Sequence, residues 1–178
     1  WDSGATAQKI LNKVLASRDA EQMKDLYLID TRTDTIVSHR DVGVGVSQII
    51  PILATAMSLQ GKSIMIEEPE SHLHPRAQAE LADVFIESAL GEGIRNSFII
   101  ETHSETLLLR VLRRIRESSF NKIEDRPKLS PDDVAFVYID PLKGGARAIN
   151  VRIDERGRVL DSLPDGFFEE DFEELFGG

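Results

Sequence analysis

The chain has 178 residues, of which 41% are hydrophobic and 29% are charged, the proportions of a soluble globular domain. A net charge of −10 argues against a domain that binds nucleic acid over much of its surface, although a local basic strip is compatible with this net charge. The absence of cysteine excludes disulfides and thiolate zinc sites. No apolar run approaches membrane-spanning length, and Trp1 opens no basic-then-apolar leader. We therefore expect a cytoplasmic protein without a membrane partner, and a piece of something longer.

The first forty residues carry the pattern of a helix followed by a hairpin. Helical spacing of apolar residues predicts a helix over Ala5–Ala20. Two β-like runs follow, Asp25–Asp30 and Thr35–His39, and a short polar segment joins them. This arrangement predicts a β-hairpin, so residues 1–40 are expected to form a lead-in to the rest of the chain.

A glycine-containing segment comes next. Gly43 and Gly45 alternate with valines, and Ser47 is placed to cap an apolar helix over Gln48–Ser58, with Pro51 in or near its first turn. A glycine-rich segment at a helix N-terminus offers free amides and a positive dipole end to an anion. A glycine bulge feeding a buried helix would have the same sequence.

The stretch from residue 63 to 75 organises the chain. A short apolar run ends in two adjacent carboxylates, Glu67 and Glu68, and reads as a buried parallel strand covered on both faces. In sheets of such strands, ligands bind at the carboxyl ends of the strands. If Glu68 still lies in the strand, the two side chains point to opposite faces and have separate roles. Pro69 then ends the strand, and Pro75 fits the first turn of the next helix.

A second strand and helix repeat this arrangement. A helix is expected over Arg76–Leu90, then a buried strand over Asn96–Glu101, then a helix over Thr106–Arg116. Thr102 has capping-box spacing from the glutamate three residues later. His103 follows the strand end, where an imidazole can donate to a phosphate in the same crevice.

Together these segments resemble the ATP-binding-cassette-type ATPases. The apolar run with Glu67-Glu68 resembles Walker B, residues 70–75 resemble the D-loop, and residues 45–48 resemble a divergent signature motif. His103, in an Ile-Ile-x-Thr-His-Ser context, resembles the switch histidine. The chain departs from the family at Gly45 and Val46, and at Glu67, where Walker B usually has Asp.

The resemblance is closest to the SMC-, RecF- and overcoming-lysogenization-defect-like group. It implies an α/β, P-loop NTPase-like layered fold with mainly parallel core strands, in which two domains dimerise around ATP. It assigns Mg²⁺ to Glu67, activation of the attacking water to Glu68 and γ-phosphate contact to His103. The segment that would complete the partner chain's ATP site comprises Gly43, Gly45, Ser47 and Gln48.

The phosphate-binding loop of that family is missing from the sequence. No Gly-x-x-x-x-Gly-Lys-Ser/Thr occurs, and Gly61-Lys62-Ser63 does not supply one, because Ala56 stands at the first glycine position and a strand follows. Residues 41–117 are therefore expected to be the signature, Walker B and switch-histidine half of an ATPase domain. Its partner would be the missing N-terminal half, and the chain alone would be inactive.

Residues 118–178 are expected to add a loop, a hairpin and a tail. Ser118–Pro131 reads as an exposed loop, and Val134–Asp140 with Ala148–Asp154 reads as a β-hairpin. The acidic, phenylalanine-rich residues 163–176 resemble an uncharacterised C-terminal extension of some bacterial ATPases. The preceding helix carries an arginine cluster that we expect to be a solvated face: Arg110, Arg113, Arg114 and Arg116.

Two other functions stay open at this point. The first is a metal-dependent hydrolase that uses Glu67, Glu68, His72 and His74, since imidazole and carboxylate suit zinc, iron or manganese. The second is a non-catalytic interaction module that kept the fold but lost nucleotide binding.

Overall fold

A computed structural model describes most of the chain between residues 27 and 162. The described ranges are 27–30, 33–38, 42–93, 95–121 and 126–162. The helix expected at Ala5–Ala20 and the tail at 163–176 lie outside them. The backbone divides into two compact units, Trp1–Ser47 and Gln48–Gly178. In the described part, no helix has the length and apolar character that crossing a membrane requires.

The first unit contains the predicted hairpin. Strand β1 (Tyr27–Asp30) pairs antiparallel with β2 (Thr35–Ser38), so that Tyr27 faces Ser38 across the ladder. Asp34 takes a positive φ of 52° in the turn, a conformation that aspartate tolerates. The hairpin prediction is confirmed.

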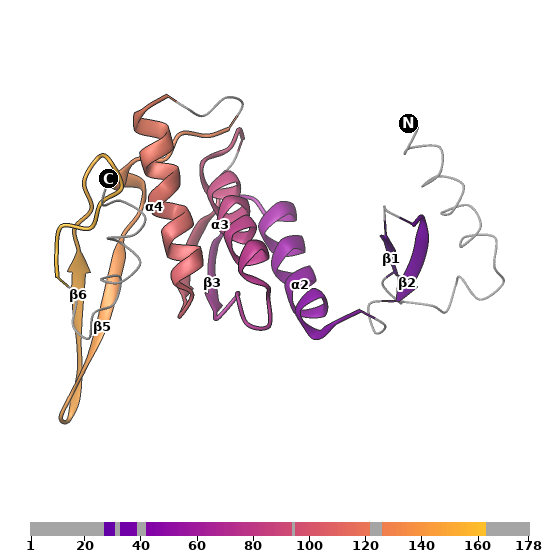
Figure 1. Ribbon diagram of the computed structural model, residues 1–178, viewed down its shortest axis with the longest axis horizontal. Coiled ribbons are helices and arrows are strands. Elements are labelled where there is room, and N and C mark those ends of the chain that lie inside the picture. Colours follow the sequence, from indigo (N-terminus) through magenta and orange to yellow (C-terminus); the bar gives the residue numbers. More distant parts are fainter. Residues whose placement is uncertain (1–26, 31–32, 39–41, 94, 122–125, 163–178) are drawn as a thin grey trace. The chain divides into compact units, whose positions relative to one another are not determined.

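The second unit is built on a β-α-β arrangement. Strands β3 (Ser63–Glu67) and β4 (Ser97–Glu101) pair in parallel, and helix α3 (Pro75–Leu90) connects them. Helices α2 (Val44–Ser58) and α4 (Glu105–Ser119) complete the group (Figure 1). The predicted order of elements is confirmed, and α4 extends three residues beyond the expected end.

One face of the β3–β4 pair is buried and the other is open. Apolar residues of the inner face pack against buried Leu81, Phe85 and Leu107 of the helices. On the opposite face Met65 is 77% exposed and Ile99 is 62% exposed. The expectation of a strand covered on both faces is therefore wrong for the described chain, because α2, α3 and α4 supply apolar contacts to one face only.

The sheets are also less parallel than expected. Three two-stranded sheets are described, and only β3–β4 is parallel. The other two pairs are joined by short turns, which permit antiparallel pairing alone. The expectation of mainly parallel strands holds only for the pair that carries the predicted site.

Asn96 closes the amino end of the parallel pair. It is 4% exposed, and its Nδ2 donates to the Leu59 carbonyl (2.7 Å) and to Ser88 Oγ (3.0 Å). Its Oδ1 accepts from the Lys62 amide at 3.0 Å. One buried side chain thus joins the end of α2, the start of β3 and helix α3.

The arginine cluster on α4 is not a uniformly solvated face. The side chain of Arg114 is 1% exposed, and its Nη2 donates to the Pro127 carbonyl at 3.2 Å. Arg110 Nη2 donates to Asp83 Oδ2 on α3 at 2.7 Å. Burial lowers the pKa of Arg114, whereas the hydrogen bond that Arg110 donates to Asp83 raises the pKa of Arg110. The face is therefore a helix–helix contact in part, because Asp83 on α3 offers a half-buried counter-charge that the sequence pattern does not reveal.

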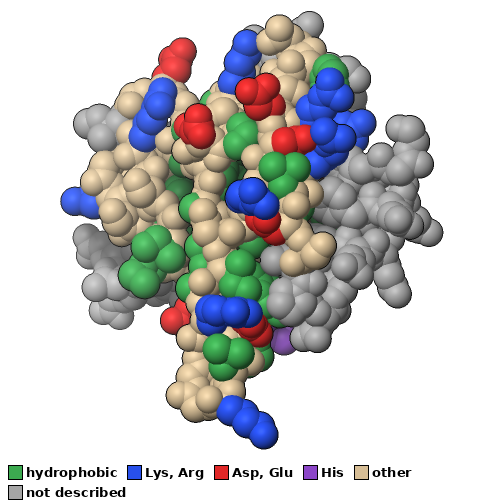
Figure 2. All heavy atoms as spheres, turned by 90° about the vertical axis from the view of Figure 1, so that its left-hand side faces the viewer, with side chains coloured by type: hydrophobic (Ala, Val, Ile, Leu, Met, Phe, Trp, Pro, Cys, Tyr) green, Lys and Arg blue, Asp and Glu red, His purple; other side chains and the backbone are tan. Residues whose placement is uncertain are grey.

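The C-terminal part forms the second predicted hairpin, shifted by two to three residues. Strand β5 (Phe136–Leu142) pairs antiparallel with β6 (Gly145–Val151) after a short 3₁₀ turn, η1 (Pro131–Asp133). Exposed hydrophobic side chains stand between charged ones on this side of the molecule (Figure 2). Leu129, expected in an exposed loop, is 4% exposed and packs on Ile115 of α4, so that part of the loop prediction is wrong.

Candidate functional site

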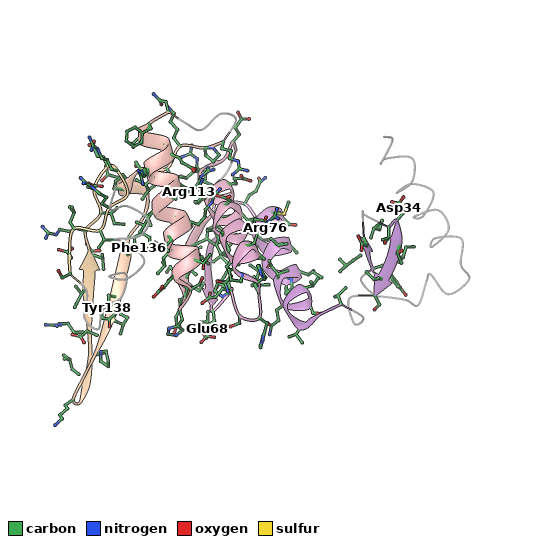
Figure 3. All side chains as sticks on the ribbon, viewed as in Figure 1. Asp34, Glu68, Arg76, Arg113, Phe136 and Tyr138 are labelled. Atoms are coloured by element: carbon green, nitrogen blue, oxygen red, sulfur yellow. The ribbon has the colours of Figure 1, made fainter. Side chains whose placement is uncertain are left out.

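The parallel register brings the carboxyl ends of β3 and β4 to one edge. Glu67 faces Glu101 across the ladder, and the amide of Glu68 donates to the Glu101 carbonyl at 2.8 Å. His103 follows two residues after β4 ends. The sequence-predicted Glu67, Glu68 and His103 therefore lie on the segments that leave the same edge, and Figure 3 labels Glu68 there.

Glu67 ends β3 on its open face. The burial pattern alternates along both strands, and both Glu67 and Glu101 are exposed. Because register partners in a sheet share a face, the two carboxylates stand beside each other. Sequence reasoning missed Glu101, although it ends its strand as Glu67 does.

Glu68 lies outside the strand in a strained conformation. Its φ is +43°, a left-handed value that is unusual for glutamate. Its carboxylate Oε2 accepts from Ser71 Oγ at 3.0 Å, and its carbonyl accepts from the Ser71 amide at 3.1 Å. The expectation that Glu67 and Glu68 point to opposite faces of a strand therefore does not apply, because β3 ends at Glu67.

His103 is exposed, but its backbone is fixed. Its amide donates to Oε1 of Glu70 at 2.8 Å, and Glu70 itself is 7% exposed. Helix α4 is capped by Ser104, whose Oγ accepts from the Leu107 amide at 3.0 Å. The expected cap, Thr102, instead accepts from the Ser104 amide at 3.0 Å, because α4 begins at Glu105, two residues later than a cap at Thr102 would place it.

Two further histidines, His72 and His74, have local structural settings. His74 caps α3, and its Nδ1 accepts from the Arg76 amide at 3.3 Å, while Pro75 occupies the first turn as predicted. His72 takes a φ of +62° in the preceding loop. Among the described residues, no three His, Asp or Glu side chains converge as a metal site. The hydrolase alternative that relies on such a cluster is therefore not supported.

The glycine-containing segment differs from its predicted form. Helix α2 begins at Val44, and the amides of Val46 and Ser47 both donate to the Gly43 carbonyl, at 3.0 and 3.3 Å. Ser47 is thus a first-turn residue and not the N-cap. Pro51 lies inside the helix and not near its start. The helix starts earlier because glycine at position 45 does not prevent the first turn.

The four predicted signature residues are divided between the two compact units. Gly43, Gly45 and Ser47 belong to the first unit, and Gln48 begins the second. Their assignment to a nucleotide stays a prediction.

A hollow elsewhere in the second unit does not include these groups. It has a volume of about 400 Å³, lies between α3, α4 and β4, and is lined mainly by apolar side chains. None of the described residues that line it is Glu67, Glu68 or His103. Glu67, Glu68 and His103 are themselves exposed, so the candidate site is an open sheet edge, which needs a further covering element to exclude water.

Comparison with known protein families places the chain. A family model described as AAA ATPase domain matches residues 3–108, more than half of the chain. The match includes β3, β4 and every predicted site residue. No curated protein matches the chain.

Proposed function

The chain belongs to the AAA ATPase domain family, and from this premise we propose that it supplies the water-activating edge of an ATP-hydrolysing site. The observation that carries the proposal is the hydrogen-bonded junction of β3 and β4. It gathers Glu67, Glu68 and His103 where α/β sheets bind their ligands.

Glu68 is proposed as the general base. It is exposed, leaves the sheet edge in a strained conformation, and has one carboxylate oxygen oriented by Ser71. Backbone strain of this kind persists where the surrounding structure fixes it, and it gathers at functional sites. In this role Glu68 accepts a proton from the water that attacks the γ-phosphate.

Glu67 is proposed as a ligand of Mg²⁺. Magnesium is bound by one or two carboxylates together with water and substrate phosphates, and an exposed carboxylate at the strand end fits that requirement. The ion, when bound, offsets the negative charge of the phosphates. His103 donates to the γ-phosphate from the neighbouring strand end.

The finer proposal is an ATP-binding-cassette-type arrangement. Here two copies dimerise around ATP, and the segment from Gly43 to Gln48 completes the partner's site. The phosphate-binding loop and its lysine come from sequence outside this chain, because the 178 residues contain no such motif.

The decisive variant is Glu68→Gln in the protein that joins this chain to its phosphate-binding half. Loss of a general base should lower ATP turnover by at least about a hundredfold, with the dissociation constant for Mg-ATP unchanged. Glu80→Gln is the matched control, since Glu80 is an exposed residue of α3 that pairs with Arg76. Unchanged turnover in Glu68→Gln would refute the assignment of the base.

Calorimetric titration of Mg-ATP into the 178-residue chain tests the shared-site proposal. We expect no binding, because the phosphate cradle lies elsewhere. Tight binding would instead mean that the chain builds a phosphate site without a P-loop. A joined protein that binds no Mg-ATP would favour the interaction module over the ATPase.

A further inference from the structure

Glu70 is a buried carboxylate in the loop between β3 and α3. It is 7% exposed, whereas Glu68 in the same loop and Glu67 at the end of β3 are exposed. Buried carboxylates are rare unless they are paired, because removing their charge from water costs free energy. Glu70 Oε1 accepts from the His103 amide at 2.8 Å. Within the described part of the chain, its Oε2 is buried without a hydrogen-bond partner.

A second connection joins the same two loops. Gln78 Nε2 donates to the Leu73 carbonyl at 3.0 Å, and Gln78 Oε1 accepts from Ser104 Oγ at 2.7 Å. Ser104 also caps α4 through the Leu107 amide. His103 is thus attached to the loop after β3 through its own amide, and through the side chain of the residue that follows it.

We propose that Glu70 and Gln78 are positioning residues that hold the His103 backbone to the loop carrying Glu68. The inference rests on the proposed function, because it gives the proposed base and the proposed phosphate donor a fixed relative geometry. Neither positioning residue needs to touch ATP.

The choice of a carboxylate at position 70 supports a role beyond folding. An amide acceptor such as glutamine would bond the His103 amide without burying a charge. A charged acceptor makes a shorter and stronger hydrogen bond to an amide than a neutral one does. The arrangement therefore favours a rigid attachment of His103 at the cost of burying a charge.

The first test measures the attachment directly, by NMR of backbone amides in the 178-residue chain. In Glu70→Ala the His103 amide should exchange with solvent about tenfold faster, the effect of losing one hydrogen bond. In Glu70→Gln, which retains an acceptor, exchange should stay close to that of the unaltered chain while the His103 amide proton shifts upfield. An unchanged His103 amide shift in Glu70→Gln would overturn the inference, even if Glu70→Ala fails to fold.

Gln78→Ala supplies an independent variant. It should speed exchange of the Leu107 amide, because Ser104 loses the partner that orients its hydroxyl. Glu80→Ala is the control on the same helix and should alter neither amide. Equal exchange of the Leu107 amide in Gln78→Ala and Glu80→Ala would remove Gln78 from the proposal.

The second test is a double-mutant cycle of ATP turnover in the joined protein. Glu70→Ala should lower kcat about tenfold with KM for ATP unchanged, and should add nothing in a His103→Ala background. Additive losses would overturn the positioning role. If His103→Ala leaves turnover intact, the proposed function of His103 fails, while amide exchange still decides whether Glu70 holds it.

Discussion

The two ends of the β3–β4 pair are built differently. At the amino end, buried Asn96 uses its side-chain donors and acceptor on neighbouring elements. At the carboxyl end, Glu68 is strained, Glu70 keeps a buried oxygen without a partner in the described part, and Glu67 with Glu101 exposes adjacent carboxylates. The amino end, where the polar groups of the buried side chain are hydrogen-bonded, contributes to stability. The carboxyl end, with its strained backbone and a polar atom without a partner, is suited to bind a ligand.

The largest expected effect on stability lies at the amino end. Asn96→Ala should lower the free energy of unfolding by about 3 kcal/mol, because it removes the three hydrogen bonds that this buried side chain makes with Leu59, Lys62 and Ser88. Urea denaturation of the chain measures this loss. The control is Asn150→Ala, at an exposed position of β6, which should change the free energy of unfolding by less than about 0.5 kcal/mol. A similar small change for Asn96→Ala would contradict its structural role.

An opposite result is expected at Glu68. Glycine adopts a φ of +43° without strain, so Glu68→Gly should leave stability unchanged or raise it by up to about 1 kcal/mol. ATP turnover in the joined protein should nevertheless be lost. The matched control is Glu101→Gly in extended β4, which should lose about 0.5–1 kcal/mol. A comparable loss in Glu68→Gly would show that the left-handed conformation is not strained.

The smallest effect is expected at Ser71. Its hydroxyl donates to Glu68 Oε2 in an exposed setting. Ser71→Ala should leave stability nearly unchanged and lower turnover about two- to fivefold, the effect of one modest hydrogen bond. Ser119→Ala, which removes an exposed hydroxyl bonded to Arg116 at the end of α4, should lower neither. A loss as large as that of Glu68→Gln would mean that Ser71 does more than orient the base.

The sequence by itself determined the alternation of strands and helices in the second unit. Apolar periodicity, Pro75 and Gly91 fix α3 locally, and two short apolar runs fix β3 and β4. Because parallel strands end at one edge, Glu67, Glu68 and His103 could be assigned to a common edge before any coordinates. These features depend on residues close together in the chain.

Tertiary structure alone decided the contacts between distant segments. It paired Glu67 with Glu101, attached Glu70 to the His103 amide and buried Arg114 against Asp83. It also gave Glu68 its left-handed backbone. Periodicity reports which face of an element is apolar, but it contains no information about which polar groups another element brings to it. For that reason the sequence predicted which residues lie at the carboxyl edge of β3 and β4, but it did not predict the hydrogen bonds that position them.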